Sequence, residues 1–286
     1  MNQQEYFKNV QNHTAKKVQI VNNFGPPMAL IKVPMNVIDG LVKTTDRILG
    51  TKYDSHGDRL VGQIKHEAAL TVDDLDESGA AYFFYGCALF YIQNVLRQSL
   101  THSSNNEELQ RDYDINVMYN TAWTVSQYEN EYNPVHFHTG SEISSVCYLK
   151  IPEYKKRWGN DRKDKTNSCD GAIEFIHHAS QVNSLETGTK RYTPEVGDLF
   201  LFPASLLHTV YPFLGDGERR SLAFNMSYQV RNKKTGLVSN GYPDRVVMNP
   251  DIGMASTEIP KEYFKENWRE NATPSSKMKE IEQNDK

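Results

Sequence analysis

The stretch Asn133-Pro134-Val135-His136-Phe137-His138-Thr139 contains two histidines separated by one residue. Successive side chains of a β-strand alternate between its two faces, so His136 and His138 would point the same way. A third histidine, His208, follows much later, in the stretch Phe202-Pro203-Ala204-Ser205-Leu206-Leu207-His208. Two imidazoles on one strand and a third from a distant strand suit a mononuclear metal site. We therefore predict that these histidines bind one metal ion.

The composition indicates a soluble globular protein. The chain has 286 residues, of which 38% are hydrophobic and 24% charged, with a formal net charge of −4. This balance, without basic runs, argues against binding to nucleic acid or to a membrane surface. No apolar stretch has the length of a membrane span, and the first residues lack the apolar segment of a signal peptide. Three scattered cysteines suit reduced thiols, so we expect a cytoplasmic protein.

The first part of the chain, residues 1–112, is predicted to be an extended segment and helices that pack on a core. A strand is expected at 28–33, and a helix from Asn36, as N-terminal cap, to Gly50. The acidic residues between 73 and 77 are expected in a solvated loop, and Ser78 is expected to cap a second helix that runs to about Leu100. These helices would support the core or contribute to a homodimer interface.

Short strands and turns follow from about residue 114. Glycine, proline, asparagine and aspartate separate apolar runs, which predicts strands at 115–127, 135–138, 144–151, 172–177, 191–193, 199–203, 208–213 and 221–230. About eight short strands at this spacing are typical of a jelly-roll barrel. The predicted fold class is thus mainly β, or α+β, with a jelly-roll core at 113–232. Residues 233–286 would be an extension with a charged, partly disordered tail.

A candidate anion site follows the third histidine. Arg219 and Ser221 are two residues apart, so on a strand they would face inward together and offer a guanidinium fork and a hydroxyl to one carboxylate. Arg220 would face outward into solvent. Tyr148 is a candidate third donor, although a half-buried barrel tyrosine explains it equally well. The pattern therefore predicts an anionic co-substrate beside the metal.

The remaining histidines fit structural positions better than functional ones. Polar or turn-like surroundings predict that four of them lie on the surface: His13, His56, His66 and His102. His177 and His178 end a predicted strand, where they would lie at the solvent edge.

The motifs resemble those of the 2-oxoglutarate/Fe(II) oxygenases found in marine bacteria and phages. The segments that carry the resemblance are Asn133-Pro134-Val135-His136-Phe137-His138-Thr139, Ser144-Ser145-Val146-Cys147-Tyr148, Gly197-Asp198-Leu199-Phe200-Leu201-Phe202-Pro203-Ala204, Leu206-Leu207-His208 and Arg219-Arg220-Ser221-Leu222-Ala223-Phe224-Asn225. Together they cover roughly residues 115 to 230, and their combination is specific although each piece alone is not.

The resemblance implies a double-stranded β-helix core, iron at the histidine site and 2-oxoglutarate on Arg219, with Ser221 and Tyr148 beside it. The implied reaction uses O2 and hydroxylates a C–H bond of a protein side chain or small metabolite, releasing succinate and CO2, with ascorbate as an accessory reductant. A cupin-like metal enzyme, such as an isomerase, is one alternative, although it would have no need of Arg219 and Ser221. A non-catalytic jelly-roll interaction protein is another.

The ligand set stays open at this point. Non-haem Fe(II) oxygenases usually supply a carboxylate two residues after the first histidine, whereas this chain has His138 there. In one possible set, which we favour, all three histidines bind the metal. In a second set only His138 and His208 bind it, and His136 lies beside the metal without binding it. Glu142 is a further candidate carboxylate, although it follows a turn and would have to bend back.

Overall fold

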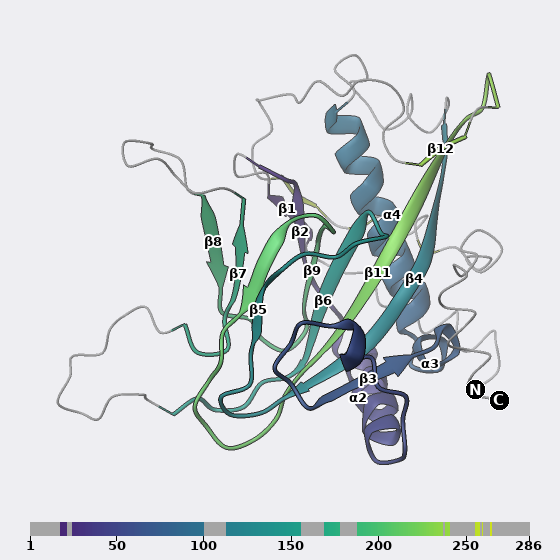
Figure 1. Cartoon of the computed structure of the whole chain (residues 1–286). Coiled ribbons are helices and arrows are strands. Elements are labelled where there is room, and N and C mark those ends of the chain that lie inside the picture. The colour runs from purple at the N-terminus through teal and green to yellow at the C-terminus, as the bar shows by residue number, and fades with distance from the viewer. Residues whose placement is uncertain are drawn as a thin grey trace, which may run out of the picture.

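The structure is a computed structural model that describes residues 18–21, 25–99, 113–155, 169–177, 188–236, 238–240, 255–257, 259 and 264. Two antiparallel β-sheets form its centre, and helices cover the outer face of the larger sheet (Figure 1). No helix in these ranges is long and apolar enough to cross a membrane.

Eight strands build a barrel from the two sheets. Four lie side by side in the larger sheet, in the order β9 (Asp198–Pro203), β6 (Ile143–Lys150), β11 (Arg219–Asn232) and β4 (Tyr113–Gln127). Four form the smaller sheet, in the order β5 (Asn133–His136), β10 (Leu207–Val210), β7 (Ile173–Ile176) and β8 (Thr189–Tyr192). The chain passes repeatedly from one sheet to the other, which makes a double-stranded β-helix. The predicted fold class and its eight strands are confirmed, with some shifted ends.

Further strands extend the larger sheet at both edges. On one side β2 (Met28–Lys32) pairs with β9, followed outward by β1 (Val18–Val21) and β13 (Ala255–Thr257). On the other side β3 (His66–Leu70) pairs with β4, and β12 (Val238–Asn240) pairs with the end of β11. The strand at 28–33 is confirmed, whereas β3 was not predicted. A short 3-10 turn, η1 (Gly57–Arg59), precedes β3.

In the described ranges, α2 (Met35–Leu49) and α4 (Ala80–Ser99) lie against the outer face of the larger sheet, and the short α3 (Val72–Glu77) packs on both of these helices. The aromatic side chains of α4 are buried in the main core, as its spacing predicts. The predicted cap at Asn36 is wrong, because α2 begins at Met35 after Pro34 without a side-chain cap. The predicted acidic loop is also wrong, because Thr71 and Asp74 form a capping box that starts α3.

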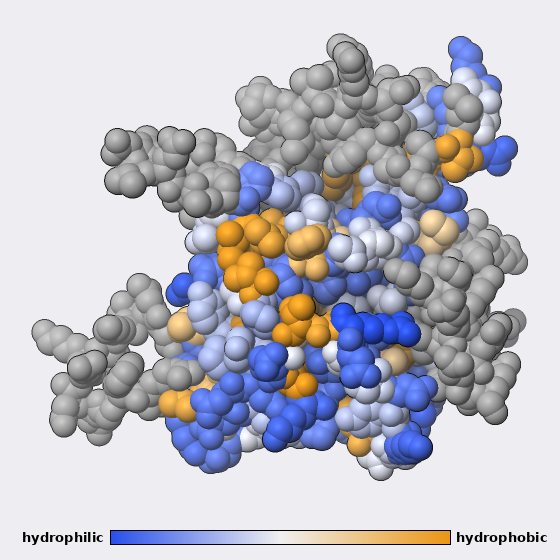
Figure 2. Space-filling view, viewed as in Figure 1, coloured by the Kyte–Doolittle hydropathy of each residue, from blue (hydrophilic) through white to orange (hydrophobic). Residues whose placement is uncertain are grey.

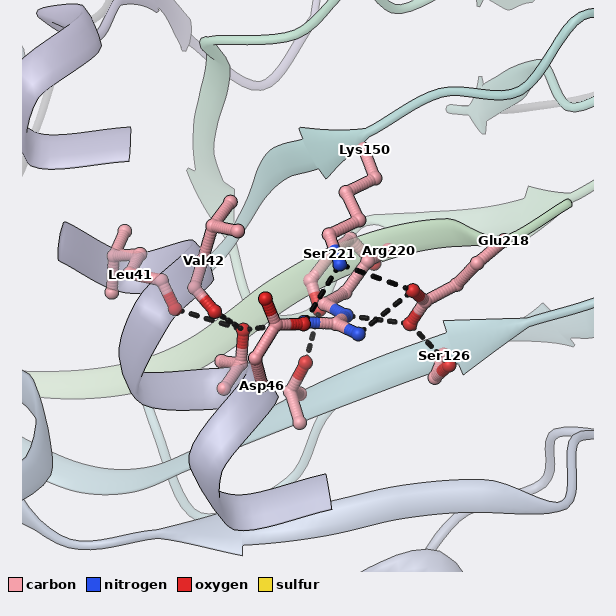
Figure 3. A network of polar contacts seen from close by, with 10 residues as sticks. Leu41, Val42, Asp46, Ser126, Lys150, Glu218, Arg220 and Ser221 are labelled. Carbon is pink, nitrogen blue, oxygen red and sulfur yellow. Dashed lines mark hydrogen bonds and ion pairs between the residues drawn. The ribbon is translucent and has the colours of Figure 1, made fainter. Parts of the chain in front are cut away.

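A partly buried ion-pair network joins α2 to the start of β11 (Figure 3). Arg220 is only 4% exposed, so the prediction that it is solvated is wrong. Its Nη1 donates to Asp46 at 2.6 Å and to Thr45 at 3.0 Å, and its Nε and Nη2 donate to Glu218 at 2.5 and 2.7 Å. Lys150 adds a contact to the same two carboxylates. Arg220 thus faces away from the barrel interior, as expected, but into protein.

Arg220→Met is expected to lower the free energy of unfolding by about 3–5 kcal/mol, because it strands the carboxylate of Glu218 without its main partner. Urea denaturation of the full chain measures the change. Arg47→Met is the control, because Arg47 is half exposed and pairs with Asp74 and Glu77 on the surface; it should cost under about 1 kcal/mol. Equal losses in the two variants would contradict the prediction.

Candidate metal centre and anion pocket

Three histidines lie close together at strands β5 and β10 of the smaller sheet. His136 on β5 is the direct cross-strand partner of His208 on β10. His138 lies just past the end of β5, where its backbone N–H donates to the carbonyl of Ala204 at 2.9 Å. The three residues offer ligand atoms that all lie within 4.8 Å of one another. The structure therefore brings together the histidines that the sequence pattern grouped.

Hydrogen bonds orient two of these rings for metal binding. Nδ1 of His136 lies 2.7 Å from the carbonyl oxygen of Pro134, and Nδ1 of His208 lies 2.9 Å from that of Leu206. An Nδ1–H that donates to a carbonyl leaves Nε2 free to bind a metal. Burial lowers the pKa of all three imidazoles, that of His138 to about 4. They are therefore neutral at physiological pH, the form that binds metals.

Asn225 on β11 supports the third ring. Its amide Nδ2 lies 3.4 Å from Nδ1 of His138, and its buried Oδ1 has no hydrogen-bond partner in the described part of the chain. If the amide is turned over, Oδ1 accepts the Nδ1–H of His138 and both groups are satisfied. Nε2 of His138 is then free for a metal, like those of His136 and His208. Asn225 closes one of the motifs quoted above, but its role was not predicted.

Asn225→Ala is expected to weaken metal binding about 10- to 100-fold, the usual effect of losing a partner that orients a ligand. Asn225→Asp is the matched control, because its carboxylate still accepts from Nδ1 of His138 and should keep most of the affinity. Competition between the protein and a chromogenic chelator for Co(II) measures the change. Wild-type affinity in Asn225→Ala would exclude this role.

A buried cation lies in the same cavity. Arg219 is 1% exposed, and its Nη1 donates to Oε1 of Gln127 at 2.8 Å. Its Nε and Nη2, and the hydroxyl of Tyr148, have no hydrogen-bond partner among the residues described. The guanidinium carbon lies 4.7 Å from the centre of the Tyr148 ring. Because buried donors are rarely left unpaired, this arrangement indicates that an anionic ligand binds here.

The sheet register places Ser221, the third residue predicted to hold the carboxylate, beside Arg219 and Tyr148. Ser221 on β11 is opposite Tyr148 on β6 and opposite Val125 on β4. Directly opposite residues point to the same face of a sheet, so these side chains share one inward row. One cavity is lined by all six predicted site residues: His136, His138, Tyr148, His208, Arg219 and Ser221. Burial raises the pKa of Tyr148 to about 12, so its hydroxyl stays a donor.

Glu142 and His56 lie outside the histidine cluster. Glu142 is exposed and does not belong to the histidine cluster. His56, predicted on the surface, is 5% exposed and stacks on Trp123 with ring centres 4.9 Å apart. That prediction is wrong because the turn that carries His56 folds over the barrel. His66 and His177 are exposed, as predicted, whereas His13, His102 and His178 lie outside the described residues.

A second hollow adjoins the cavity, and several residues line both. It is lined by His136 and His138 and by residues of the loop after η1 and the segment after β5, among them Leu60, Val61, Phe137 and Thr139. The face of the molecule in Figure 2 carries apolar patches between polar side chains. Val61, Val135 and Phe137 are each at least half exposed. An organic substrate would therefore meet apolar surface as it approaches the histidines.

The fold and the site together define a class of protein. A double-stranded β-helix with three inward imidazoles and an inward arginine has the parts of a non-haem iron oxygenase that uses an oxo-acid co-substrate. Residues 121–225 match the model of a family described as "Putative 2OG-Fe(II) oxygenase". Over this segment the sequence is similar to that family, and together with the site described above this identifies a 2-oxoglutarate- and Fe(II)-dependent oxygenase.

Solved structures with a related fold are distant. A Pseudomonas putida prolyl-4-hydroxylase is 16% identical, with a TM-score of 0.39, and the match covers 78% of this chain and 98% of that one. A Trichoplax adhaerens prolyl hydroxylase in complex with a hypoxia inducible factor peptide is 12% identical, with a TM-score of 0.42 and coverages of 78% and 91%. HygX from Streptomyces hygroscopicus, with nickel and 2-oxoglutarate bound, is 13% identical, with a TM-score of 0.37 and coverages of 79% and 86%. No curated protein matches the chain.

Proposed function

We propose that His136, His138 and His208 bind Fe(II), and that Arg219, Ser221 and Tyr148 hold the distal carboxylate of 2-oxoglutarate. One observation carries this assignment. Three imidazoles with ligand atoms within 4.8 Å of one another line the same cavity as a buried arginine that has two unpartnered nitrogens in the described structure. The first set suits a divalent transition metal and the second suits a carboxylate.

When bound, Fe(II) supplies the redox chemistry by which O2 and 2-oxoglutarate yield succinate and CO2 and a C–H bond is hydroxylated. The residues of the chain position the reactants. The three imidazoles would hold the metal and leave room in the cavity for co-substrate and O2. The guanidinium of Arg219, held by Gln127, fixes the far end of the co-substrate. The apolar walls, which include Ile173, Phe202 and Val210, limit access of water.

A ligand set of three histidines changes the charge of the centre. Each neutral imidazole leaves the charge of Fe(II) uncompensated, whereas a carboxylate would remove one unit. The described residues offer no carboxylate in the cluster, because its members are His136, His138 and His208 alone. The more positive centre would bind the oxo-acid end of 2-oxoglutarate more strongly. The lack of a carboxylate in this cluster, among the described residues, supports the set of three histidines over a set that includes Glu142.

Anaerobic titration with Fe(II) and 2-oxoglutarate tests the proposal. The chelate should give a weak visible charge-transfer band with wild-type protein, and addition of O2 should then release succinate. A wild-type protein that binds Fe(II) but gives no band would contradict the proposal. It would favour a cupin-like metal enzyme, for which Zn(II) or Mn(II) would support activity and Arg219 would be dispensable.

The remaining proposals concern the substrate, the cellular location and the oligomeric state of the protein. We propose an organic substrate, either a protein side chain or a small metabolite, that reaches the iron through the apolar rim of the second hollow. The cytoplasmic location and the homodimer stay predictions. Size-exclusion chromatography with light scattering would decide the oligomeric state.

A further inference from the structure

A buried carboxylate lines the cavity and has no part in the function proposed above. Glu67 on β3 is 2% exposed and faces the same cavity as the three histidines. It is opposite Val125, which in turn is opposite Ser221, so Glu67 extends the inward row that contains Ser221 and Tyr148. Two strand spacings separate it from Ser221, a distance of about 10 Å. Glu67 therefore lies on the side of the cavity away from the predicted carboxylate site.

The described part of the chain provides no cation for this carboxylate. Its Oε1 has no hydrogen-bond partner among the described residues. Burial, with a smaller contribution from the negative charge of Glu131, raises the pKa of Glu67 to about 7. A buried carboxylate without a partner is costly, and a protein normally pairs it or leaves it protonated. When it is ionised, Glu67 therefore needs a partner that donates hydrogen bonds and carries positive charge.

A neighbouring glycine lets a second oxygen lie close to this one. A Cβ atom on Gly62 would lie 3.2 Å from Oε1 of Glu67 and 2.3 Å from Oδ1 of Asn133, so both oxygens pack against the Gly62 backbone and lie at most about 5.5 Å apart. Hydrogen bonds from an ammonium group to such oxygens are about 2.8 Å long, so a single nitrogen on the cavity side can reach both. The pair of oxygens has the spacing and the charge to hold one protonated amine.

The position of the pair links it to the histidines. Asn133 begins β5, the strand that carries His136, and Asn133, Glu67 and His136 all line the cavity. The loop that contains Gly57 and Gly62 folds around the Glu67 carboxylate, since a Cβ on Gly57 would lie 3.2 Å from its Oε2. A group bound by Glu67 would therefore be held at a fixed place relative to the metal centre.

We propose that Glu67 and Asn133 bind a protonated amine of the primary substrate and so orient a neighbouring C–H bond toward the histidine cluster. The substrate class is an aliphatic amine, free or as part of a side chain. The orientation rests on the proposed iron site, whereas the binding of the amine does not. The two can therefore fail separately.

Saturation-transfer NMR with the full-length protein tests the binding. At pH 8, where Glu67 is ionised, n-butylammonium should bind wild-type protein at least about tenfold more tightly than 1-butanol, which has the same chain without the charge. Glu67→Gln keeps the shape of the side chain and should abolish this preference. Gly62→Ala, which places a methyl group between the two oxygens, should weaken n-butylammonium binding as well. Glu142→Gln, an exposed carboxylate outside the cavity, is the matched control and should keep the preference.

Two results would overturn the proposal. One is equal binding of n-butylammonium and 1-butanol to wild-type protein, which would fit a protonated Glu67 that only anchors its own loop. The other is an unchanged preference in Glu67→Gln. The experiment needs no iron, so amine binding without a 2-oxoglutarate chelate band would refute the metal assignment and leave this inference standing. A chelate band without amine binding would do the reverse.

Discussion

His208→Ala is expected to abolish the Fe(II)–2-oxoglutarate chelate band and the release of succinate. His208 is the most buried of the three histidines, at 5% exposed, and it alone comes from β10. Its loss would leave two rings from one short segment and no ligand on the opposite strand. Losing an outer partner of a metal ligand costs about 10- to 100-fold in affinity, and losing a ligand should cost more.

His66→Ala is the matched control, because His66 is exposed and does not line the cavity. Iron content after anaerobic loading and desalting, together with succinate formed in air, measures both variants. An undiminished chelate band in His208→Ala would refute the metal assignment. His136→Ala then separates the two ligand sets: it should lose iron if three histidines bind, and keep the band if only His138 and His208 do.

Arg219→Ala is expected to raise the 2-oxoglutarate concentration needed for half-maximal turnover by about 30- to 3,000-fold. Removing one partner of a buried, hydrogen-bonded charge pair costs about 2–5 kcal/mol, which corresponds to this range. Iron binding should be unchanged, because the candidate ligands are histidines and a guanidinium offers no lone pair to a metal. Arg219→Lys should be intermediate, since lysine keeps the charge but loses the planar fork.

Arg191→Ala is the control for this effect, because Arg191 pairs with Glu174 and does not line the cavity. Steady-state measurements at saturating Fe(II), combined with the anaerobic chelate titration, give the co-substrate requirement directly. Similar requirements in Arg219→Ala and wild-type protein would place the anion site elsewhere. A lower iron affinity in Arg219→Ala would show that the variant has disturbed the barrel as a whole.

The barrel, and the faces on which the six candidate site residues lie, were predictable because both depend on local pattern. Glycine, proline and aspartate mark the ends of the strands, and alternation along a strand decides which side chains share a face. His136 with His138 and Arg219 with Ser221 follow this rule directly. That these pairs come together with Tyr148 in one cavity depends on sheet register, which the resemblance supplied and spacing alone could not.

The features that were missed depend on contacts between distant segments. β3 is a short strand with His66 and Glu67 at its start, so nothing in its composition separates it from a loop, and the cavity role of Glu67 was hidden with it. Arg220 is buried because α2 brings Asp46 against it, a contact between residues 174 positions apart in the chain. His56 is buried because its turn closes over Trp123. Each of these features is decided by tertiary packing and not by local sequence preference.

The ion-pair network around Arg220 limits how small a working version of this enzyme can be. Residues 219 to 221 present an anion-binding group to the inside and a salt bridge to helix α2 on the outside. Cutting the chain before β4 would remove Asp46 and Thr45 and uncover the apolar outer face of the larger sheet, which α4 covers. Attempts to produce the barrel alone should therefore yield aggregates, and libraries for altered substrate choice should keep the N-terminal helices intact.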